Sequence, residues 1–410
     1  MKYLLCCILL TLIFASCESE KEMIDGYAHL KPITPVKLKY SEDLTFDFRI
    51  YEENDSTAKI YFDILNENLL SKRDTLDRWT RKAALQIAVR KNSLTKEVYD
   101  SQSKNWLNIG NENFIDSISI KIPKREDVFI STIYTDQNKH VYFENQNWWI
   151  RKKTFIPEQF ILLNLQDKKP TVKHFIKQDS LLIKSEMHNN QTVEIKQIKE
   201  HYKPAIAPFS TSNSDPDFSK FDTIFSCKFV NNELKMNSKD LITIITNQAD
   251  NAESLGFFTY SKNEIEIAYL CMTYLCSANE IEKFKDQNQQ AAAFEEFWLK
   301  AAQNDKNKAN QLKKEFLRRV EFANKNFSSY KLGALTDLGM IYIVYGEPNK
   351  IEKDGFQQNW YYSQQVNEQI RFTFMNDQSI MFPNNFYLER GPNYRSSYYL
   401  AVENWRNGFL

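Results

Sequence analysis

The feature that most constrains this chain is a run near its C-terminal end, from Gly333 to Pro348, with the sequence GALTDLGMIYIVYGEP. A polar turn with two glycines leads into an unbroken apolar stretch, which stops at Gly346-Glu347-Pro348. Glycine and proline punctuate turns, and a short apolar run between them is typical of a strand buried on both faces. We therefore predict a tight turn followed by a buried strand from Met340 to Tyr345.

The run resembles the core of the GWxTD domain, a family of bacterial cell-envelope proteins without a settled biochemical activity. The similarity extends through Phe297-Trp298, Arg318-Arg319-Val320 and Trp405-Arg406. Ala334 stands where the family has its tryptophan, so a ligand-stacking role of that tryptophan is not expected here. The resemblance implies an exported envelope protein, and it assigns the motif positions Gly333, Thr336, Asp337, Gly339, Tyr342, Gly346 and Pro348.

The N-terminus carries the pattern of a secretory signal over residues 1–16. Lys2 precedes the apolar stretch Leu4–Phe14, which is too short to span a membrane, and the small residues Ala15-Ser16 follow it. The end of this segment resembles the bacterial lipobox, in which Cys17 becomes the lipidated first residue after cleavage. Phe14 departs from the aliphatic residue that is usual there. The alternative is ordinary secretion, with no modification of Cys17.

Residues 17–37 are predicted to form a tether behind this anchor. The stretch Glu18–Glu22 is acidic and lacks apolar side chains, so it cannot pack into a core. Similar acidic stretches direct some lipoproteins to the cell surface, but a plain solvated spacer needs the same composition. We predict an outer-membrane lipoprotein and leave its surface or periplasmic face open.

The overall composition describes a folded chain of several domains. With 410 residues, two or three domains are expected, and 42% apolar residues argue against disorder. Aromatic residues make up 14% of the chain, which favours pleated sheets. Lys and Arg together number 53, as do Asp and Glu, so no overall positive field is present to attract nucleic acid. We predict no nucleic-acid partner.

Two β-sandwich domains of immunoglobulin-like type are predicted, at residues 38–156 and 157–276. Alternating apolar and polar residues bounded by turn signals indicate short antiparallel strands. A proline-bearing stretch, Pro204–Ser219, is interpreted as a long loop inside the second sandwich. The predicted strands are Leu44–Leu65 with a turn at Glu53–Ser56, Ala83–Arg90, Ser117–Ile122, Val128–Tyr134, Val141–Phe143, Phe160–Leu165, Leu181–Ser185, Thr192–Ile198, Thr223–Phe229 and Ile265–Tyr274.

The remaining residues, 277–410, are predicted to form a C-terminal α+β domain similar to GWxTD. Ser277 and Glu280 have the spacing of a capping box, which indicates that helices follow. Apolar residues at helical spacing predict helices at Ala291–Gln303 and from Lys306. The predicted sheet follows, with strands Asn359–Tyr362 and Ile370–Phe374. The complete fold class is therefore multidomain β plus α+β.

A closing helix is predicted from Tyr398, Val402 and Trp405, which recur on one face and are expected to be buried. The competing interpretation is that Trp405-Arg406 forms an exposed tail that binds a partner. We interpret Arg390, Arg395 and Arg406 as members of solvated ion pairs.

Neither a metal site nor a cofactor site is predicted. Five histidines are scattered without zinc-ligand spacing, and no Walker loop, dinucleotide fingerprint or nucleophile elbow is present. After Cys17, three cysteines remain, Cys227, Cys271 and Cys276, and an odd number permits at most one internal disulfide. We interpret Cys271 and Cys276 as small apolar core residues.

Two carboxylates in this run, Asp337 and Glu347, are the candidates for acid–base chemistry. A carboxylate at a turn can act as a general base, and Tyr342 and Tyr345 could line a sugar or peptide cleft. The structural interpretation is simpler, because Asp or Thr at a turn accepts hydrogen bonds from nearby backbone N–H groups. We therefore assign no catalytic residue and keep Asp337 and Glu347 as the alternative.

These observations predict a lipid-anchored envelope protein that binds or assembles another envelope protein without catalysis. The alternative is a hydrolase of an envelope polymer that uses Asp337 or Glu347, and a lipoprotein that delivers substrates is a third possibility. A deep cleft with a desolvated carboxylate would favour the enzyme, whereas an exposed aromatic patch would favour the binder.

The anchor is directly testable with Cys17→Ala. The variant has no thiol to carry a lipid, so it is expected to leave the membrane fraction when cells are fractionated. A variant that stays in the membrane as fully as the wild type would contradict lipidation at Cys17.

Overall fold

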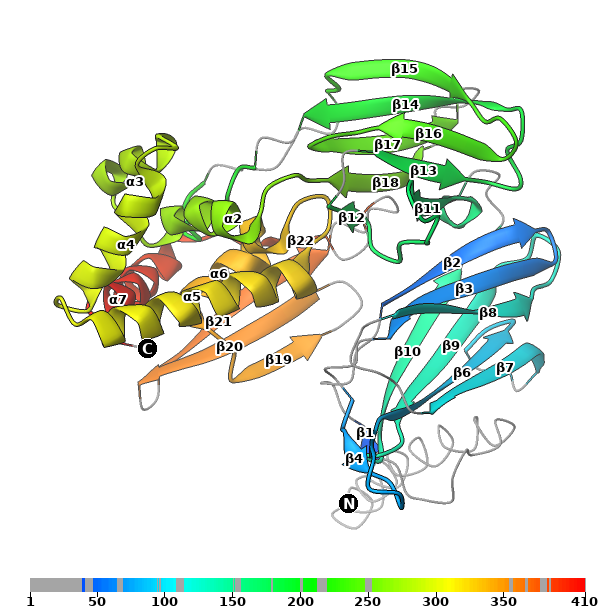
Figure 1. Ribbon diagram of the computed structural model, residues 1–410, viewed down its shortest axis with the longest axis horizontal. Helices are drawn as coiled ribbons and strands as arrows, with labels where there is room; N and C mark the ends of the chain where they lie inside the picture. Colours follow the sequence, from blue (N-terminus) through cyan, green and yellow to red (C-terminus); the bar gives the residue numbers. More distant parts are fainter. Residues whose placement is uncertain are drawn as a thin grey trace, which may run out of the picture. The chain divides into compact units, whose positions relative to one another are not determined.

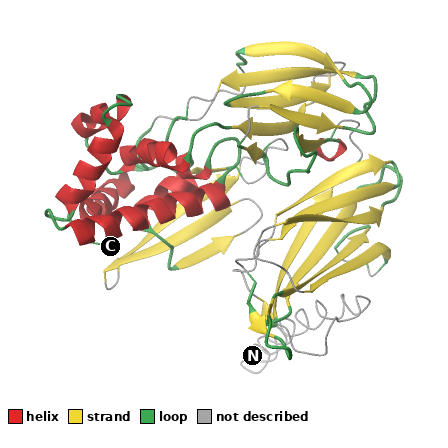
Figure 2. Cartoon of the chain, viewed as in Figure 1, coloured by secondary structure: helices red, strands yellow, loops and turns green. Residues whose placement is uncertain are grey.

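The computed structural model describes residues 39–40, 47–64, 69–93, 95, 97–107, 114–149, 151, 156–177, 180–199, 202–211, 220–247, 253–353, 357–365, 368–376, 382 and 385–409. Contacts divide the chain into two compact units, Met1–Thr154 and Phe155–Leu410. The described α-helices all belong to the second unit (Figures 1 and 2). The predicted signal, Cys17 and the tether to residue 37 lie outside the described residues.

The first unit contains a five-stranded sheet, β1-β10-β9-β6-β7, a three-stranded sheet, β2-β3-β8, and a small hairpin, β4-β5. Neighbouring strands are antiparallel except β1 and β10. The strands are β1 (Lys39–Tyr40), β2 (Asp47–Asn54), β3 (Thr57–Ile64), β4 (Lys72–Arg73), β5 (Trp79–Thr80), β6 (Lys82–Arg90), β7 (Val98–Leu107), β8 (Phe114–Lys121), β9 (Val128–Asp136) and β10 (Val141–Trp149).

The core of this unit lies between the two larger sheets. Every second residue of β3 is buried, including Ile60 and Phe62, as expected for a strand with one face toward the core. The Phe62 ring meets the edge of Trp106, on β7 of the other sheet, with 5.4 Å between ring centroids. The strands predicted within 44–65, 83–90, 117–122 and 128–134 are confirmed.

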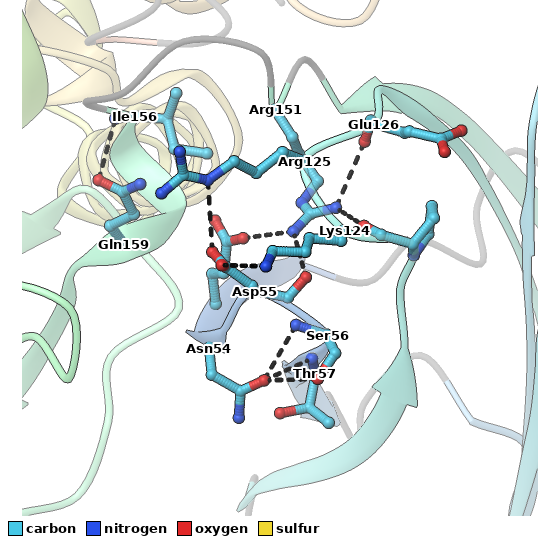
Figure 3. A network of polar contacts seen from close by, with 12 residues as sticks. Asn54, Asp55, Ser56, Thr57, Lys124, Arg125, Glu126, Arg151, Ile156 and Gln159 are labelled. Carbon is cyan, nitrogen blue, oxygen red and sulfur yellow. Dashed lines mark hydrogen bonds and ion pairs between the residues drawn. The ribbon is translucent and has the colours of Figure 1, made fainter.

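A buried ion pair fastens the end of this unit. The Glu52 and Arg151 side chains are almost fully enclosed and meet at 2.5 Å. Arg151 also donates to the backbone oxygens of Asp55, Pro123 and Glu126, so it ties the β2–β3 turn to the segment before β9 (Figure 3). Burial raises the pKa of the Glu52 carboxyl, and the Arg151 guanidinium opposes this rise.

The β-rich part of the second unit contains the sheets β11-β13-β16 and β12-β18-β17-β14-β15. Phe160, Leu181 and Ile183 pack against Ile195 and Phe257 in one core between them. The strands are β11 (Ile161–Asn164), β12 (Phe175–Ile176), β13 (Ser180–Lys184), β14 (Thr192–Lys199), β15 (Thr223–Lys228), β16 (Glu233–Asn237), β17 (Leu241–Asn247) and β18 (Glu253–Thr259).

The α+β part of the second unit combines helices with the four-stranded sheet β19-β20-β21-β22. The helices are α2 (Glu264–Cys271), α3 (Ala278–Lys285), α4 (Gln290–Ala301), α5 (Lys306–Phe327), α6 (Asp337–Tyr345) and α7 (Arg395–Arg406). The strands are β19 (Lys350–Lys353), β20 (Gln357–Gln365), β21 (Glu368–Asn376) and β22 (Phe386–Leu388).

The two parts of the second unit share a core. Ile242, Ile244 and Phe258, from β17 and β18, belong to the same buried cluster as residues of all the described α-helices. The predicted boundary between residues 276 and 277 lies inside this compact unit.

Two predicted strands are wrong, because both segments are helical. Met340–Tyr345 belongs to α6, and Ile265–Tyr274 forms α2 followed by a 3₁₀ turn at Met272–Tyr274. Residues 337–344 are all buried, and an apolar run without a polar face cannot distinguish a helix from a buried strand. The missed signal for α2 is a capping box, in which Asn263 and Glu266 exchange hydrogen bonds of 2.8 and 3.0 Å.

The other predicted helices are confirmed. Ser277 begins α3, and its backbone N–H donates to the Glu280 carboxylate at 2.8 Å. Asp305 caps α5 by accepting hydrogen bonds from the N–H groups of Asn307 and Lys308. Cys227, Cys271 and Cys276 are free. Cys271 is a buried core residue as predicted, whereas Cys227 and Cys276 are partly exposed.

Trp405, on α7, sits in an aromatic cluster at the centre of the helical region. Its ring lies 5.7 Å from that of Trp298 and 6.0 Å from that of Phe316, while the Arg319 guanidinium stacks on it at 4.8 Å. The indole N–H donates to the Val344 carbonyl at 3.0 Å. Trp405 is only 2% exposed, so the alternative of an exposed Trp405 tail is wrong.

Trp405→Ala is expected to destabilise the second unit by about 3 to 5 kcal/mol, the usual cost of truncating a buried tryptophan. Because the core is shared, the loss should extend to β17 and β18, while the first unit keeps its stability. Limited proteolysis, with the fragments identified by mass spectrometry, reports the protease resistance of each unit separately. The matched control is Phe409→Ala, since Phe409 is 64% exposed, and equal protease resistance in both variants would contradict the core role.

Candidate functional site

The site that the sequence singles out is the segment from Gly333 to Gly346, here called the motif segment. It begins with a 3₁₀ turn, Gly333–Leu335, and continues as α6. Thr336 caps α6, because its hydroxyl accepts the Gly339 N–H at 3.1 Å and donates to the Gly333 carbonyl at 2.7 Å. Thr336 therefore fixes the start of a helix rather than of a strand.

The two glycines of this turn are required by close backbone packing. A Cβ on Gly333 would lie 1.9 Å from the Ala323 carbonyl oxygen of α5. A Cβ on Gly339 would lie 1.9 Å from the Gly333 carbonyl oxygen. Both contacts are backbone atoms that cannot move aside. Glycine is therefore needed at Gly333 for the turn to fit against α5, and at Gly339 for α6 to fit against the turn.

Asp337 makes tertiary contacts in addition to its place in the first turn of α6. One carboxylate oxygen accepts the Leu388 N–H at 2.8 Å, and the other pairs with Arg390 at 2.5 Å. The side chains of Asp337 and Arg390 are 8% and 15% exposed. The prediction that Arg390 belongs to a solvated ion pair is therefore wrong, since this pair is largely removed from water.

Arg390 extends the contact to a remote stretch of chain. Its guanidinium donates to the carbonyls of Ile206 and Ala207 at 2.6 and 3.0 Å, and the Gly391 N–H donates to the Pro208 carbonyl. The predicted loop between two strands is thus held to Arg390 and Gly391, and through Arg390 to Asp337 of the motif segment. Sequence reasoning missed this role of residues 205–208, for which only the prolines mark the segment as irregular.

The backbone of Ala334 supplies further contacts at the position where the family motif has tryptophan. Its carbonyl accepts the Tyr274 hydroxyl at 2.8 Å, and its N–H donates to the Asn324 side chain at 2.9 Å. Burial raises the pKa of Tyr274 well above its usual value. The Ala205 N–H donates to the Leu335 carbonyl at 2.9 Å.

The remaining motif positions end α6 and face its neighbours. Tyr342 is buried and stacks on Phe322 of α5, with 4.4 Å between ring centroids. Gly346 adopts a positive φ of 84°, which glycine tolerates, and its carbonyl accepts the Tyr362 hydroxyl at 2.9 Å. Pro348 is partly exposed.

The two carboxylates of the catalytic alternative occupy different environments. Asp337 is buried and engaged, whereas Glu347 is exposed to solvent. An open cavity of about 720 Å³ lies beside Arg390 and is lined by Arg371, Glu389 and Tyr394 among others. Asp337 does not line it, so this cavity gives a substrate no direct path to that carboxylate.

The described residues hold neither a cluster of metal ligands nor a membrane-spanning helix. Within that part of the chain, no three His, Cys, Asp or Glu side chains converge as metal ligands do. The His188 ring stacks on Phe160 and bonds to the Ser185 hydroxyl inside the core, and burial lowers its pKa to about 4. No described helix has the length and hydrophobicity needed to cross a membrane.

Comparison with known proteins gives a family match for the C-terminal part of the chain. Residues 256–407 match the family model of the GWxTD domain. A comparison with curated proteins found no match. One similar solved structure is described as "Structural basis of neurohormone perception by the receptor tyrosine kinase Torso", with 8% identity and a TM-score of 0.16, covering 59% of this chain and 87% of that chain. At this TM-score the likeness carries no argument.

Asp337→Asn keeps the size of the side chain but leaves the Arg390 charge without its anion. Breaking a buried pair in this way should lower the free energy of unfolding by about 3 kcal/mol. Denaturant titration of the full chain measures the change. Glu347→Gln is the control, because it removes an exposed carboxylate from the same run and should change stability by less than about 0.5 kcal/mol. Equal stability of the two variants would contradict the structural role of Asp337.

Proposed function

Because the chain is a GWxTD domain-containing protein, we propose that it is an exported, lipid-anchored component of the cell envelope that binds or assembles another envelope protein without catalysis. The motif positions supply the main support. The Thr336 hydroxyl caps α6, and the Asp337 carboxylate binds the Leu388 N–H of β22 and the Arg390 guanidinium. Arg390 in turn donates to the Ile206 carbonyl. A residue engaged in this way builds a rigid domain rather than turning over a substrate.

The proposed anchor and location rest on the N-terminal sequence. The apolar stretch that ends in Ala15-Ser16-Cys17 supports cleavage before Cys17 and attachment of lipid to its thiol. Lipid on Cys17, with the acidic residues that follow, supports an outer-membrane lipoprotein at either the periplasmic or the surface face. We further propose that both β-rich regions are immunoglobulin-like sandwiches, supported by short antiparallel strands in paired sheets.

The partner-binding role draws support from aromatic side chains on the surface of the α+β part. Tyr387, on β22, is 45% exposed, and Tyr399, on α7, is 53% exposed. Exposed tyrosines are enriched at protein interfaces because one ring supplies both apolar area and a hydroxyl. The hydrolase alternative has less support, since the Asp337 carboxylate is enclosed and paired with Arg390.

Photo-crosslinking at Tyr387 and Tyr399 tests the binding role in cells. A benzoylphenylalanine at either position should give one discrete adduct with an envelope protein, and Cys17→Ala should abolish it by removing the protein from its membrane. The control position is Phe322, which is 38% exposed but stacks on Tyr342.

The enzyme alternative predicts a different outcome. If the purified chain hydrolysed an envelope polymer, and Glu347→Gln abolished that activity without altering the fold, the non-catalytic proposal would be overturned. Absence of any adduct at Tyr387 and Tyr399 would also count against it.

A further inference from the structure

A hairpin in the first unit exposes large apolar side chains that its own fold leaves uncovered. The hairpin comprises residues 69–82 and contains β4, which is labelled in Figure 1, and β5. Leu76, in the turn, is 69% exposed, Trp79 is 65% exposed, and Leu70 is 46% exposed. Single exposed leucines are ordinary, but three large apolar residues on one short hairpin indicate an interaction surface.

The apolar side chains are exposed in the folded hairpin itself, because polar contacts hold the hairpin in one conformation. The Asp74 carboxylate accepts the N–H groups of Leu76 and Arg78, each at 2.9 Å, and pairs with the Arg78 guanidinium. These bonds fix the conformation of the turn, in which the Leu76 N–H is directed at the Asp74 carboxylate. The apolar tip is therefore preformed and does not depend on a partner to take shape.

The base of the hairpin is clamped to the five-stranded sheet. The Asn138 side chain donates to the carbonyls of Leu70 and Thr80 at 2.9 and 2.8 Å. The Asp136 carboxylate accepts the Leu70 N–H at 2.7 Å. A hairpin held at both ends is a rigid projection from the sheet.

The charge around these apolar residues is positive. Positions 72 to 82 hold five basic residues and two acidic ones. The basic residues are Lys72, Arg73, Arg78, Arg81 and Lys82, and the acidic residues are Asp74 and Asp77. The Arg73 guanidinium lies over the Trp79 ring at 5.1 Å. Lys139, in the β9–β10 turn beside the clamp, is exposed. Tryptophan with flanking basic residues is the composition that favours the interface of an anionic bilayer.

The hairpin projects from the end of the sheet at which the chain enters the unit. Lys39, the first residue of β1, pairs with Val141, which pairs with Asp136, and Asp136 pairs with Ala83 directly after the hairpin. Lys39, the first described residue after Cys17 in the sequence, therefore lies at the same end of the sheet as the hairpin. Leu107, which pairs with Lys82 at the same end of the sheet, is 65% exposed.

We propose that residues 69–82 lie in the headgroup region of an anionic membrane, with Leu76 and Trp79 among the upper acyl chains and Lys72 and Lys139 facing lipid phosphates. The proposal rests on the proposed function in one respect, since the lipid on Cys17 would bring this end of the unit to the bilayer. A lipid anchor and a basic, apolar surface together give firmer membrane attachment than either alone.

Vesicle binding of the chain from Glu18 onward, which carries no lipid, tests this surface separately from the anchor. The chain should sediment with vesicles of equal phosphatidylglycerol and phosphatidylcholine, and far less with phosphatidylcholine alone. Leu76→Ser combined with Trp79→Ser should weaken binding by about tenfold or more. Lys72→Gln should weaken it about fivefold, the effect of one basic charge near an anionic surface.

The matched control is Ile224→Ser combined with Val230→Ser. Ile224 and Val230 are 54% and 59% exposed but lie in the second unit, so this variant should bind vesicles like the wild type. Lipids brominated in the upper acyl chain should quench part of the tryptophan fluorescence, and Trp79→Ser should abolish that quenching.

Each outcome bears on the proposal. Failure of the wild-type chain to bind anionic vesicles, or unchanged binding by the Leu76/Trp79 variant, would overturn it. It would also be overturned if that variant bound vesicles normally but lost a cross-link to an envelope protein, because the hairpin would then be a protein-docking surface. If Cys17 is not lipidated but the chain still binds vesicles, the proposed anchor is wrong and the hairpin proposal is supported.

Discussion

The structure of the second unit depends on the pairing of Asp337 with Arg390. The carboxylate lies at the start of α6 and also accepts the Leu388 N–H, so it connects the helix to the edge strand β22. The guanidinium reaches on to the carbonyls of Ile206 and Ala207. A largely enclosed charge is tolerated only when it is paired and hydrogen-bonded. Each of these contacts therefore needs the others, and one ion pair aligns three separate stretches of chain.

Local pattern was sufficient for much of the fold. Alternating burial along β3 and the cap at Asp305 are properties of a few consecutive residues, and both were predictable. The strand predicted at Met340–Tyr345 was wrong because α6 is apolar on every side, which leaves no periodicity to read. What decides for the helix is the Thr336 cap, and a Thr-Asp pair before an apolar run is equally compatible with a turn into a strand.

The candidate site was only half visible for a different reason. The motif residues could be picked out from the sequence, but their partners lie far from them along the chain. Arg390 is 53 residues from Asp337, and Tyr274 is 60 residues from Ala334. The Ala334 contact uses backbone atoms, which every residue type provides. The type of residue at this position therefore does not indicate the contact. Spacing within a motif cannot report contacts of this kind.

The long reach of the Arg390 contact also sets an order of events when the chain folds. Ile206 and Arg390 are 184 residues apart, and Trp405 fills the same core as Ile242 and Phe258. Strands β17 and β18 are synthesised long before the residues of α7 that complete this core. Contacts of such sequence separation form late and slowly. The core that β17 and β18 share with the helices therefore cannot close until nearly the last residue has emerged.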